Sequence, residues 1–159
     1  MPELPEVQTT VDGINRRCKN QVIEAVWTDL AVPHPIKQFE NTFKDRTFYK
    51  KAEKILIGAK IVKAERRAKN ILIHLSNDYT ILVHMKMTGH MMYGSYSYDK
   101  KQNLWLPADS EKNNALRDPH NRFIHVVFSF KNGKHLVLSD VRKFAKVTLL
   151  ETADQPTSS

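Results

Sequence analysis

The sequence predicts a mainly β protein with flanking helices, built as an antiparallel sandwich or barrel. A series of short apolar runs follows one amphipathic segment, and turn signals join several of the runs. Short strands connected by tight turns favour an antiparallel arrangement over an α/β fold. The predicted strands span residues 22–27, 60–65, 70–75, 80–85, 91–96, 123–130, 135–140 and 145–150.

The segment that follows Pro5 predicts one amphipathic helix. Its apolar residues recur at i, i+4, i+7 and i+11, and they are Val7, Val11, Ile14 and Cys18. Pro5 suits the first turn, where a missing N–H costs nothing, and Glu6 suits the positive end of the helix dipole. One further short helix or turn is expected around residues 36–43.

Two hairpins are predicted, one at residues 76–78 and one at Asn132-Gly133, which is the strongest short turn signal in the chain. Residues 97–122 are polar and fit no element, and a loop of this length is usually either functional or disordered. The closing residues 151–159 are expected to form a frayed polar tail.

The composition of the 159 residues favours one globular domain with a polyanionic partner. The formal net charge is +8 and the sequence pI is about 9.6, which indicates nucleic acid or an acidic membrane surface. Cys18 is the only cysteine, so no disulfide and no cysteine-rich zinc site can form within the chain. No apolar window approaches the ~18 residues of a membrane span. We therefore expect a cytoplasmic protein with no membrane partner.

The opening MPELPEV offers a nucleophile. If Met1 is removed, Pro2 presents a secondary amine, and an α-amino group with a reference pKa near 8 is partly unprotonated at neutral pH. Such an amine can attack the anomeric carbon of a sugar and form an iminium. The alternative is that Pro2 is an ordinary second residue and that Glu3 and Glu6 are acids at a helix start.

Two further patterns suit nucleic-acid binding. Arg66, Arg67 and Lys69 precede an apolar strand, where they could grip phosphates or remain a solvated basic loop. Met87 precedes a Thr-Gly pair, and Arg142 and Phe144 stand two apart, so on an extended chain both point to one side. An exposed apolar side chain beside an arginine can act as a wedge in a base stack, although each apolar residue singly suits a core.

The histidines on apolar strands are interpreted as structural. These residues are His84, His125 and His135. No cluster of histidine, cysteine and aspartate has the spacing of metal ligands, so no metal site is predicted.

Together, MPELPEV, RRAK, HMKMTG and SDVRKF resemble the N-terminal domain of formamidopyrimidine-DNA glycosylase, in the Fpg/Nei family. The resemblance covers residues 1–150 and implies a two-layer antiparallel β-sandwich flanked by helices. It implies that Pro2 forms a Schiff base with C1′ of the damaged nucleotide, that Glu3 assists as an acid, and that Glu6 supports it. Lys69 would contact phosphate and transfer protons during β-elimination. Arg66 and Arg67 would bind DNA, and Met87, Arg142 and Phe144 would fill the gap left by the flipped lesion.

The chain departs from this family in length and in some motif residues. We expect this chain to lack the family's helix-two-turn-helix and zinc-finger domain, and therefore to hold no zinc or other cofactor. Lys86, Lys143 and Ala145 stand where the family usually has glycine, arginine and glycine. The segment 97–122 is also longer than in typical relatives.

Three functions remain open at this stage. The first is an enzyme that removes oxidised purines (8-oxoguanine and formamidopyrimidines) and cleaves the abasic site by β/δ-elimination. The second is a lesion-binding module that does not turn over, because the second domain is missing. The third is a nonspecific nucleic-acid binder. The first two imply damaged double-stranded DNA as partner, a partner that supplies the missing domain, and a monomer located in the cytoplasm, at the nucleoid in a bacterium.

Overall fold

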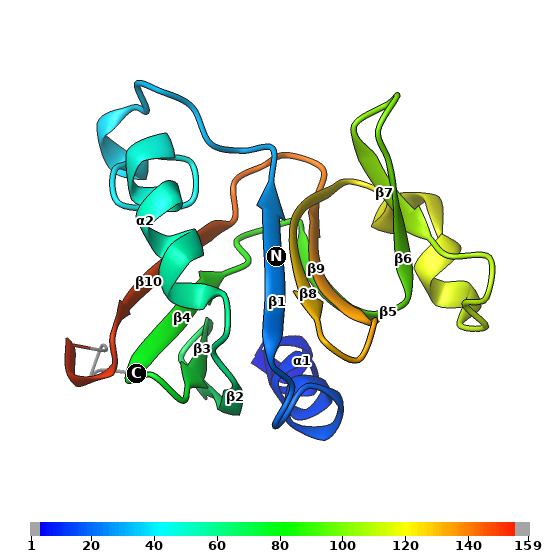
Figure 1. The fold of residues 1–159 in the computed structure, drawn as a ribbon, viewed down its shortest axis with the longest axis horizontal. Helices are drawn as coiled ribbons and strands as arrows, with labels where there is room; N and C mark the ends of the chain where they lie inside the picture. Colours follow the sequence, from blue (N-terminus) through cyan, green and yellow to red (C-terminus); the bar gives the residue numbers. More distant parts are fainter. Residues whose placement is uncertain (1–3, 155–159) are drawn as a thin grey trace.

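The computed structural model describes residues 4–154, and two four-stranded antiparallel sheets form its centre (Figure 1). Sheet I has the order β1 (Ile23–Thr28), β8 (Ile124–Phe130), β9 (His135–Asp140) and β5 (Gly89–Gly94). Sheet II has the order β10 (Lys146–Glu151), β4 (Tyr79–His84), β3 (Asn70–Leu75) and β2 (Ile61–Arg67). The predicted sandwich is therefore confirmed, because the strands form two separate sheets and not a closed barrel.

The main core lies between the inner faces of the two sheets. Along β3 and β4 the residues Ile71, Ile73, Ile81 and Val83 are each at most 1% exposed, and Phe128 and Leu138 face them from sheet I. Successive strand residues point to opposite faces, so alternate residues build the core. Each large apolar side chain buried in this way contributes about 1.5–3 kcal/mol.

Helix α1 (Leu4–Arg17) confirms the predicted amphipathic helix. Val7, Val11 and Ile14 are buried in the main core, and Cys18 is buried directly after the last helical residue. The helix contacts β2 and β5, which are edge strands of different sheets. It therefore covers one open side of the sandwich. Pro5 lies in the first turn, as its missing N–H requires.

The structure contains a second helix that the sequence analysis does not predict, α2 (Arg46–Leu56). The Asp45 side chain caps it by accepting a hydrogen bond from the Phe48 N–H. Its buried residues Tyr49, Ala52 and Leu56 follow the i, i+3, i+7 pattern, so a signal for this helix is present. The short helix expected around residues 36–43 is confirmed as η1 (Lys37–Phe39).

Residues 97–122, to which the sequence assigns no element, carry a hairpin and two short helices. The hairpin pairs β6 (Tyr96–Asp99) with β7 (Leu104–Pro107), and η2 (Asn114–Arg117) and η3 (Pro119–Asn121) follow. These elements lie beside sheet I, at the right of Figure 1. Tyr96 and Leu116 pack there on Val127 and Val137, which form a second, smaller core. Sheet I is thus apolar on both faces, and an apolar outer face requires a cover.

Both predicted hairpin turns are present. Asp78, between β3 and β4, has φ +66°, and Gly133, between β8 and β9, has φ +85°. At the chain end, Glu151 belongs to β10 and η4 (Thr152–Asp154) follows it. The Thr152 N–H donates to Asp78 O at 2.8 Å. Part of the expected tail is therefore attached to sheet II, and residues 155–159 lie outside the described part.

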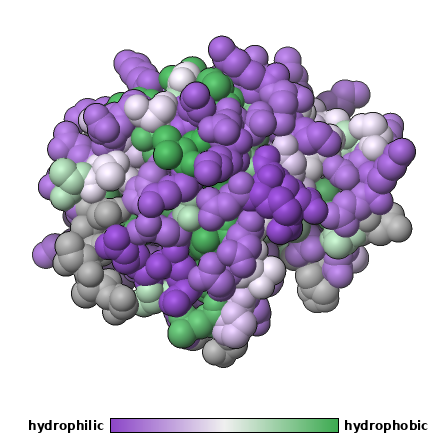
Figure 2. All heavy atoms as spheres, turned by 90° about the horizontal axis from the view of Figure 1, so that it is seen from below, coloured by the Kyte–Doolittle hydropathy of each residue, from purple (hydrophilic) through white to green (hydrophobic). Residues whose placement is uncertain are grey.

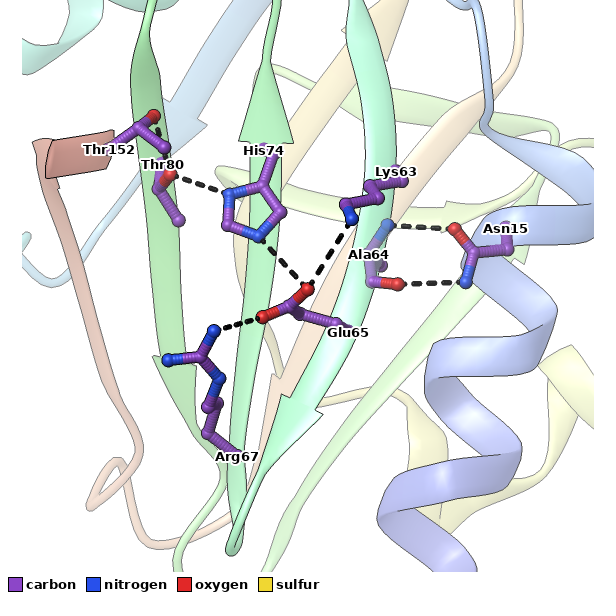
Figure 3. A network of polar contacts seen from close by, with 8 residues as sticks. All are labelled: Asn15, Lys63, Ala64, Glu65, Arg67, His74, Thr80 and Thr152. Carbon is purple, nitrogen blue, oxygen red and sulfur yellow. Dashed lines mark hydrogen bonds and ion pairs between the residues drawn. The ribbon is translucent and has the colours of Figure 1, made fainter. Parts of the chain in front are cut away.

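Replacing Asn15 with alanine tests how α1 is attached. The Asn15 side chain donates to Ala64 O at 2.8 Å and accepts from Ala64 N at 2.7 Å, so it satisfies both backbone groups of one β2 residue (Figure 3). We expect Asn15→Ala to lower the free energy of unfolding by about 1–3 kcal/mol, because two part-buried backbone groups lose their partner. Urea unfolding measures this. Arg16→Ala, at an exposed position of the same helix, is the control, and an equal loss there would contradict the prediction.

Candidate nucleic-acid interface

One end of sheet II carries a row of four residues that face one another across the strands. The register pairs Arg67 with Asn70, Asn70 with His84, and His84 with Lys146. Directly opposed residues of antiparallel strands project to the same face. The segments 68–69, 85–88 and 141–145 connect to this row, so they lie at the same end of the sheet. These segments carry Lys69, Met87, Arg142 and Phe144.

The buried carboxylate of Asp140 ties two of these segments together. Asp140 is 2% exposed, and its carboxylate accepts hydrogen bonds from Arg142 N at 3.2 Å and from Ala145 N at 2.7 Å. The Thr88 hydroxyl, on the turn that carries Met87, donates to the same carboxylate. Asp140 therefore holds the turns of Met87 and Phe144 against each other. The sequence analysis did not single it out, although it stands inside the SDVRKF motif.

Met87 and Phe144 are exposed although they are large and apolar. Their exposed fractions are 51% and 50%, and both line one groove of about 330 Å³. The other lining residues are Gln38, Phe39, Lys86 and Lys146. Exposed apolar side chains next to lysines are suited to a partner that has both planar bases and negatively charged phosphates, as nucleic acid does.

Arg142 is exposed on the same loop as Phe144, but it does not line the groove. The sequence argument places both side chains on one side of an extended chain. This prediction is wrong, because the segment 141–145 is not extended: it forms a turn in which Lys143 has φ +58°. Two Asp140 hydrogen bonds close this turn, so the alternation of an extended strand does not apply.

Lys69 lies in the tight turn between β2 and β3, where Ala68 has φ +53°. The position of Lys69 concentrates positive charge around His84. Burial lowers the pKa of His84 from its usual value of 6.5, and the charges of Lys86, Lys146 and Lys69 lower it further. The imidazole expected from the sequence to be structural is therefore neutral at pH 7 and lies among three cations.

The two arginines before Lys69 are held by the protein. Arg66 Nε donates to Gln8 Oε1 at 3.2 Å, and its Nη1 donates to Ala68 O at 2.9 Å. Arg67 Nη2 lies 2.9 Å from the Glu65 carboxylate. Both side chains are half-buried. Direct contact of Arg66 or Arg67 with DNA stays a prediction.

Helix α1 points its N-terminal end toward Lys69. Gln8 contacts Arg66 near the end of β2, whereas Asn15 contacts Ala64 earlier in that strand, so the helix runs antiparallel to β2. The start of α1 therefore approaches the turn that carries Lys69. Glu6 is exposed in this part of the helix. Pro2 and Glu3 lie outside the described residues.

A polar network on the outer face of sheet II fixes the strand that ends in Arg67 (Figure 3). The Glu65 carboxylate faces Arg67, Lys63 at 3.7 Å and His74 Nε2 at 3.5 Å. His74 Nδ1 lies 2.9 Å from the Thr80 hydroxyl, which lies 2.9 Å from that of Thr152. Burial lowers the pKa of His74 despite Glu65. Thr80 is fully buried, so its hydroxyl is not accessible as a nucleophile, and this arrangement braces the sheet.

Residues 4–154 give no support for a cysteine nucleophile, a metal site or a membrane-spanning helix. Cys18 is fully buried, and burial raises the pKa of its thiol to about 12, so it is no nucleophile. Within this range no three histidine, cysteine or acidic residues gather as a metal site would require. None of the described helices has the length and apolar character needed to cross a membrane. Seen from below, the surface is mostly hydrophilic with small, separate apolar patches (Figure 2).

Replacing Asp140 with asparagine tests the link between the two turns. The amide would turn an N–H₂ group toward donors that need an acceptor, so we expect a loss of about 1–3 kcal/mol in unfolding free energy. Amide hydrogen exchange should also accelerate at residues 141–145 and 85–88. Glu151→Gln, at an exposed position at the far end of β10, is the control. Unchanged exchange in both turns would contradict this role of Asp140.

One buried and two half-buried histidines predict a pH dependence of stability. Burial lowers the pKa of His74, His84 and His135 below 6.5, so the unfolded chain binds protons more readily than the folded one. The contribution of these neutral histidines to the free energy of unfolding is therefore fully present above the unfolded-state pKa. It is lost as the pH drops below about 6.5. We expect the melting temperature to decrease from pH 7.5 to pH 5.5. His74→Gln should reduce this decrease, and a melting temperature that rises on acidification would contradict the prediction.

Comparison with known proteins adds to this geometry. A family model described as "Formamidopyrimidine-DNA glycosylase N-terminal domain" matches residues 1–147. A protein of Desulforamulus reducens named formamidopyrimidine-DNA glycosylase is 31% identical over 157 residues, which are 98% of this chain and 46% of that protein. One of the same name from Bartonella tribocorum is 34% identical over 157 residues, which are 96% of this chain and 46% of that protein. The chain thus spans less than half the length of these relatives.

Solved structures have the same fold. Lactococcus lactis Fpg in complex with FAPY-dG-containing DNA matches with a TM-score of 0.67 and 22% identity over 95% of this chain and 45% of that one. The complex of the same protein with abasic-site DNA matches with a TM-score of 0.68 and 20% identity over the same shares. The likeness in fold agrees with the family match over nearly the whole chain. The resemblance seen in the sequence is therefore confirmed, and the chain belongs to the formamidopyrimidine-DNA glycosylase family, of which it contains the N-terminal domain.

Proposed function

We propose that this chain acts in base-excision DNA repair, as the part of a glycosylase that carries the nucleophile and the wedge. The observation that carries the proposal is the register of sheet II, which gathers Lys69, Met87, Arg142 and Phe144 at one end. The approach of α1 to the same end supports it, because this helix begins two residues after Pro2 in the sequence. The relatives are named for formamidopyrimidine lesions, and the resemblance of the motifs extends the proposed lesion class to oxidised purines such as 8-oxoguanine.

The proposed chemistry begins with Pro2 after removal of Met1. The free amine attacks C1′ of the damaged nucleotide, the bond from C1′ to the base breaks, and the base leaves with a proton. Glu3 supplies a proton to the sugar oxygen as the ring opens, and Glu6 supports it. The resulting iminium makes the C2′ proton acidic. Its loss expels the 3′-phosphate by β-elimination, with Lys69 in proton transfer, and a second elimination releases the 5′-phosphate.

The wedge residues act before this chemistry. Extruding a nucleotide costs a few kcal/mol, least at a damaged pair. Met87 and Phe144 already stand half-exposed in one groove, and Asp140 holds their turns. Because their turns are already held, these two side chains lose little conformational freedom when they enter the base stack. Their insertion therefore offsets part of the free energy needed to extrude the nucleotide. Arg142, on the same loop, would help to fill the gap, and Arg66 and Arg67 would contact the backbone.

The remaining expectations belong to the same proposal. The chain would act as a cytoplasmic monomer, at the nucleoid in a bacterium, without a cofactor of its own. A partner would supply what the relatives carry in the part of their length that this chain does not match. That part would close the other side of the bound duplex.

Borohydride trapping tests the reaction. A duplex with an abasic site or 8-oxoguanine is incubated with the chain and reduced, after intact mass has shown that Met1 is absent. We expect a covalent adduct, because borohydride reduces an iminium to a stable amine. Pro2→Gly, which replaces the secondary amine with a primary one, should weaken it at least tenfold, a loss of about 1.4 kcal/mol in transition-state stabilisation. Lys51→Ala, at an exposed lysine of α2, should leave it unchanged.

The alternative functions give different outcomes. Preferred binding of the abasic duplex without any adduct would assign a lesion-binding module instead of an enzyme. Equal affinity for damaged and undamaged duplexes would assign a nonspecific nucleic-acid binder. Either result would overturn the proposed reaction.

A further inference from the structure

One side chain that lines the groove of Met87 and Phe144 belongs to none of the sequence motifs. Phe39, from η1, lines it together with Met87 and Phe144. Phe39 lies far from both in the sequence and belongs to none of the four motifs. The chain around it is nevertheless fixed on sheet II, because Phe43 N donates to Val147 O at 2.8 Å and the Thr148 hydroxyl donates to Asn41 O at 2.6 Å.

Lysines hold the Phe39 ring and surround it with positive charge. Lys44 Nζ lies 3.6 Å from the ring centroid and donates to Lys143 O, which ties Phe39 to the loop of Phe144. Lys146 Nζ lies 5.8 Å from the same centroid. Burial lowers the pKa of Lys44, the carboxylate of Asp140 opposes this shift, and the charges of Lys143 and Lys146 lower the pKa further. A local excess of positive charge of this kind favours an anionic occupant.

The lining of the groove is complementary to a nucleotide. Its apolar part consists of Phe39, Met87 and Phe144, and its charged part of Lys86 and Lys146, with no acidic residue among the lining side chains. A volume of about 330 Å³ lies at the lower end of the roughly 300–1,000 Å³ of small-ligand sites. Aromatic side chains next to cationic ones are the usual means of binding single nucleotides of an unstacked strand.

We propose that this groove binds one unstacked nucleotide of the DNA next to the lesion, with its base against Phe39 and its phosphate at Lys86 and Lys146. The inference rests on the proposed function, because the wedge must first open the stack. It assigns Phe39 a direct contact with DNA and makes η1 (Lys37–Phe39) part of the interface. The base bound in this groove therefore belongs to a different nucleotide from the one attacked at C1′. The attacked sugar would lie at the start of α1.

The test compares Phe39→Ala with wild type on a duplex that contains a tetrahydrofuran abasic analogue. Because stacking of one base contributes roughly 1–3 kcal/mol, we expect the affinity to fall about fivefold or more. Phe39→Trp should retain wild-type affinity, since its ring can also stack. Ile36→Ala removes a neighbouring side chain that is 60% exposed and does not line the groove, and it should have no effect. Melting temperatures of all variants show whether each is folded.

A photochemical readout identifies the nucleotide. 5-Iodouracil is placed at successive positions of either strand, the complexes are irradiated, and the cross-linked residue is found by mass spectrometry. We expect a cross-link to Phe39 from one position, and that position shows which strand supplies the base.

The outcomes separate the inference from the proposed function. If wild type prefers the abasic duplex but Phe39→Ala binds it equally well, the inference fails and the proposed function stands. A loss in Ile36→Ala as large as in Phe39→Ala, or cross-links that avoid Phe39 at every position, would also overturn the inference. If wild type binds damaged and undamaged duplexes equally, both fail.

Discussion

The register of sheet II is the constraint on which the candidate nucleic-acid interface depends. Pairing of Asn70 with His84 and of His84 with Lys146 brings the ends of three strands into one row. A shift of one residue in either pair would turn every side chain of a strand to the other face and bury polar groups in the core. The core residues Ile71, Ile73, Ile81 and Val83 therefore fix the register, and the register places Lys69, Met87 and Phe144 at one end of the sheet.

The same arrangement places like charges close together, which costs free energy in the isolated protein. Burial is the main cause of the lowered pKa values of His84 and Lys44, and the charges of neighbouring lysines lower both further. A bound phosphate backbone would relieve the repulsion, so charge that opposes folding would favour DNA binding. Asp140 lies at the centre of this positive region, where its buried carboxylate satisfies backbone N–H groups of the Arg142 loop and also offsets the cations around it.

Much of the candidate interface could be predicted from the sequence because its motifs are local. The strands that surround the site appear as apolar runs, and the two hairpin turns carry residues that accept positive φ. The site also depends on contacts that no local pattern encodes. Asp140 receives a hydrogen bond from Thr88, fifty-two residues earlier, and Lys44 reaches Lys143, ninety-nine residues later. Helix α2 was missed although its apolar spacing is regular, because four basic residues within its span obscure the apolar pattern.

The sequence by itself determined the class of fold, the leading helix with Val7, Val11 and Ile14 inside, and the family, since period, turn chemistry and short motifs are properties of neighbouring residues. Only the tertiary structure decided that residues 97–122 cover an apolar outer face, that the turn at Lys143 is closed, and that Phe39 joins Met87 and Phe144 in one groove. The physical reason is that these features arise from pairing and packing between segments far apart in the chain, where each residue's surroundings are set by the register of the sheets.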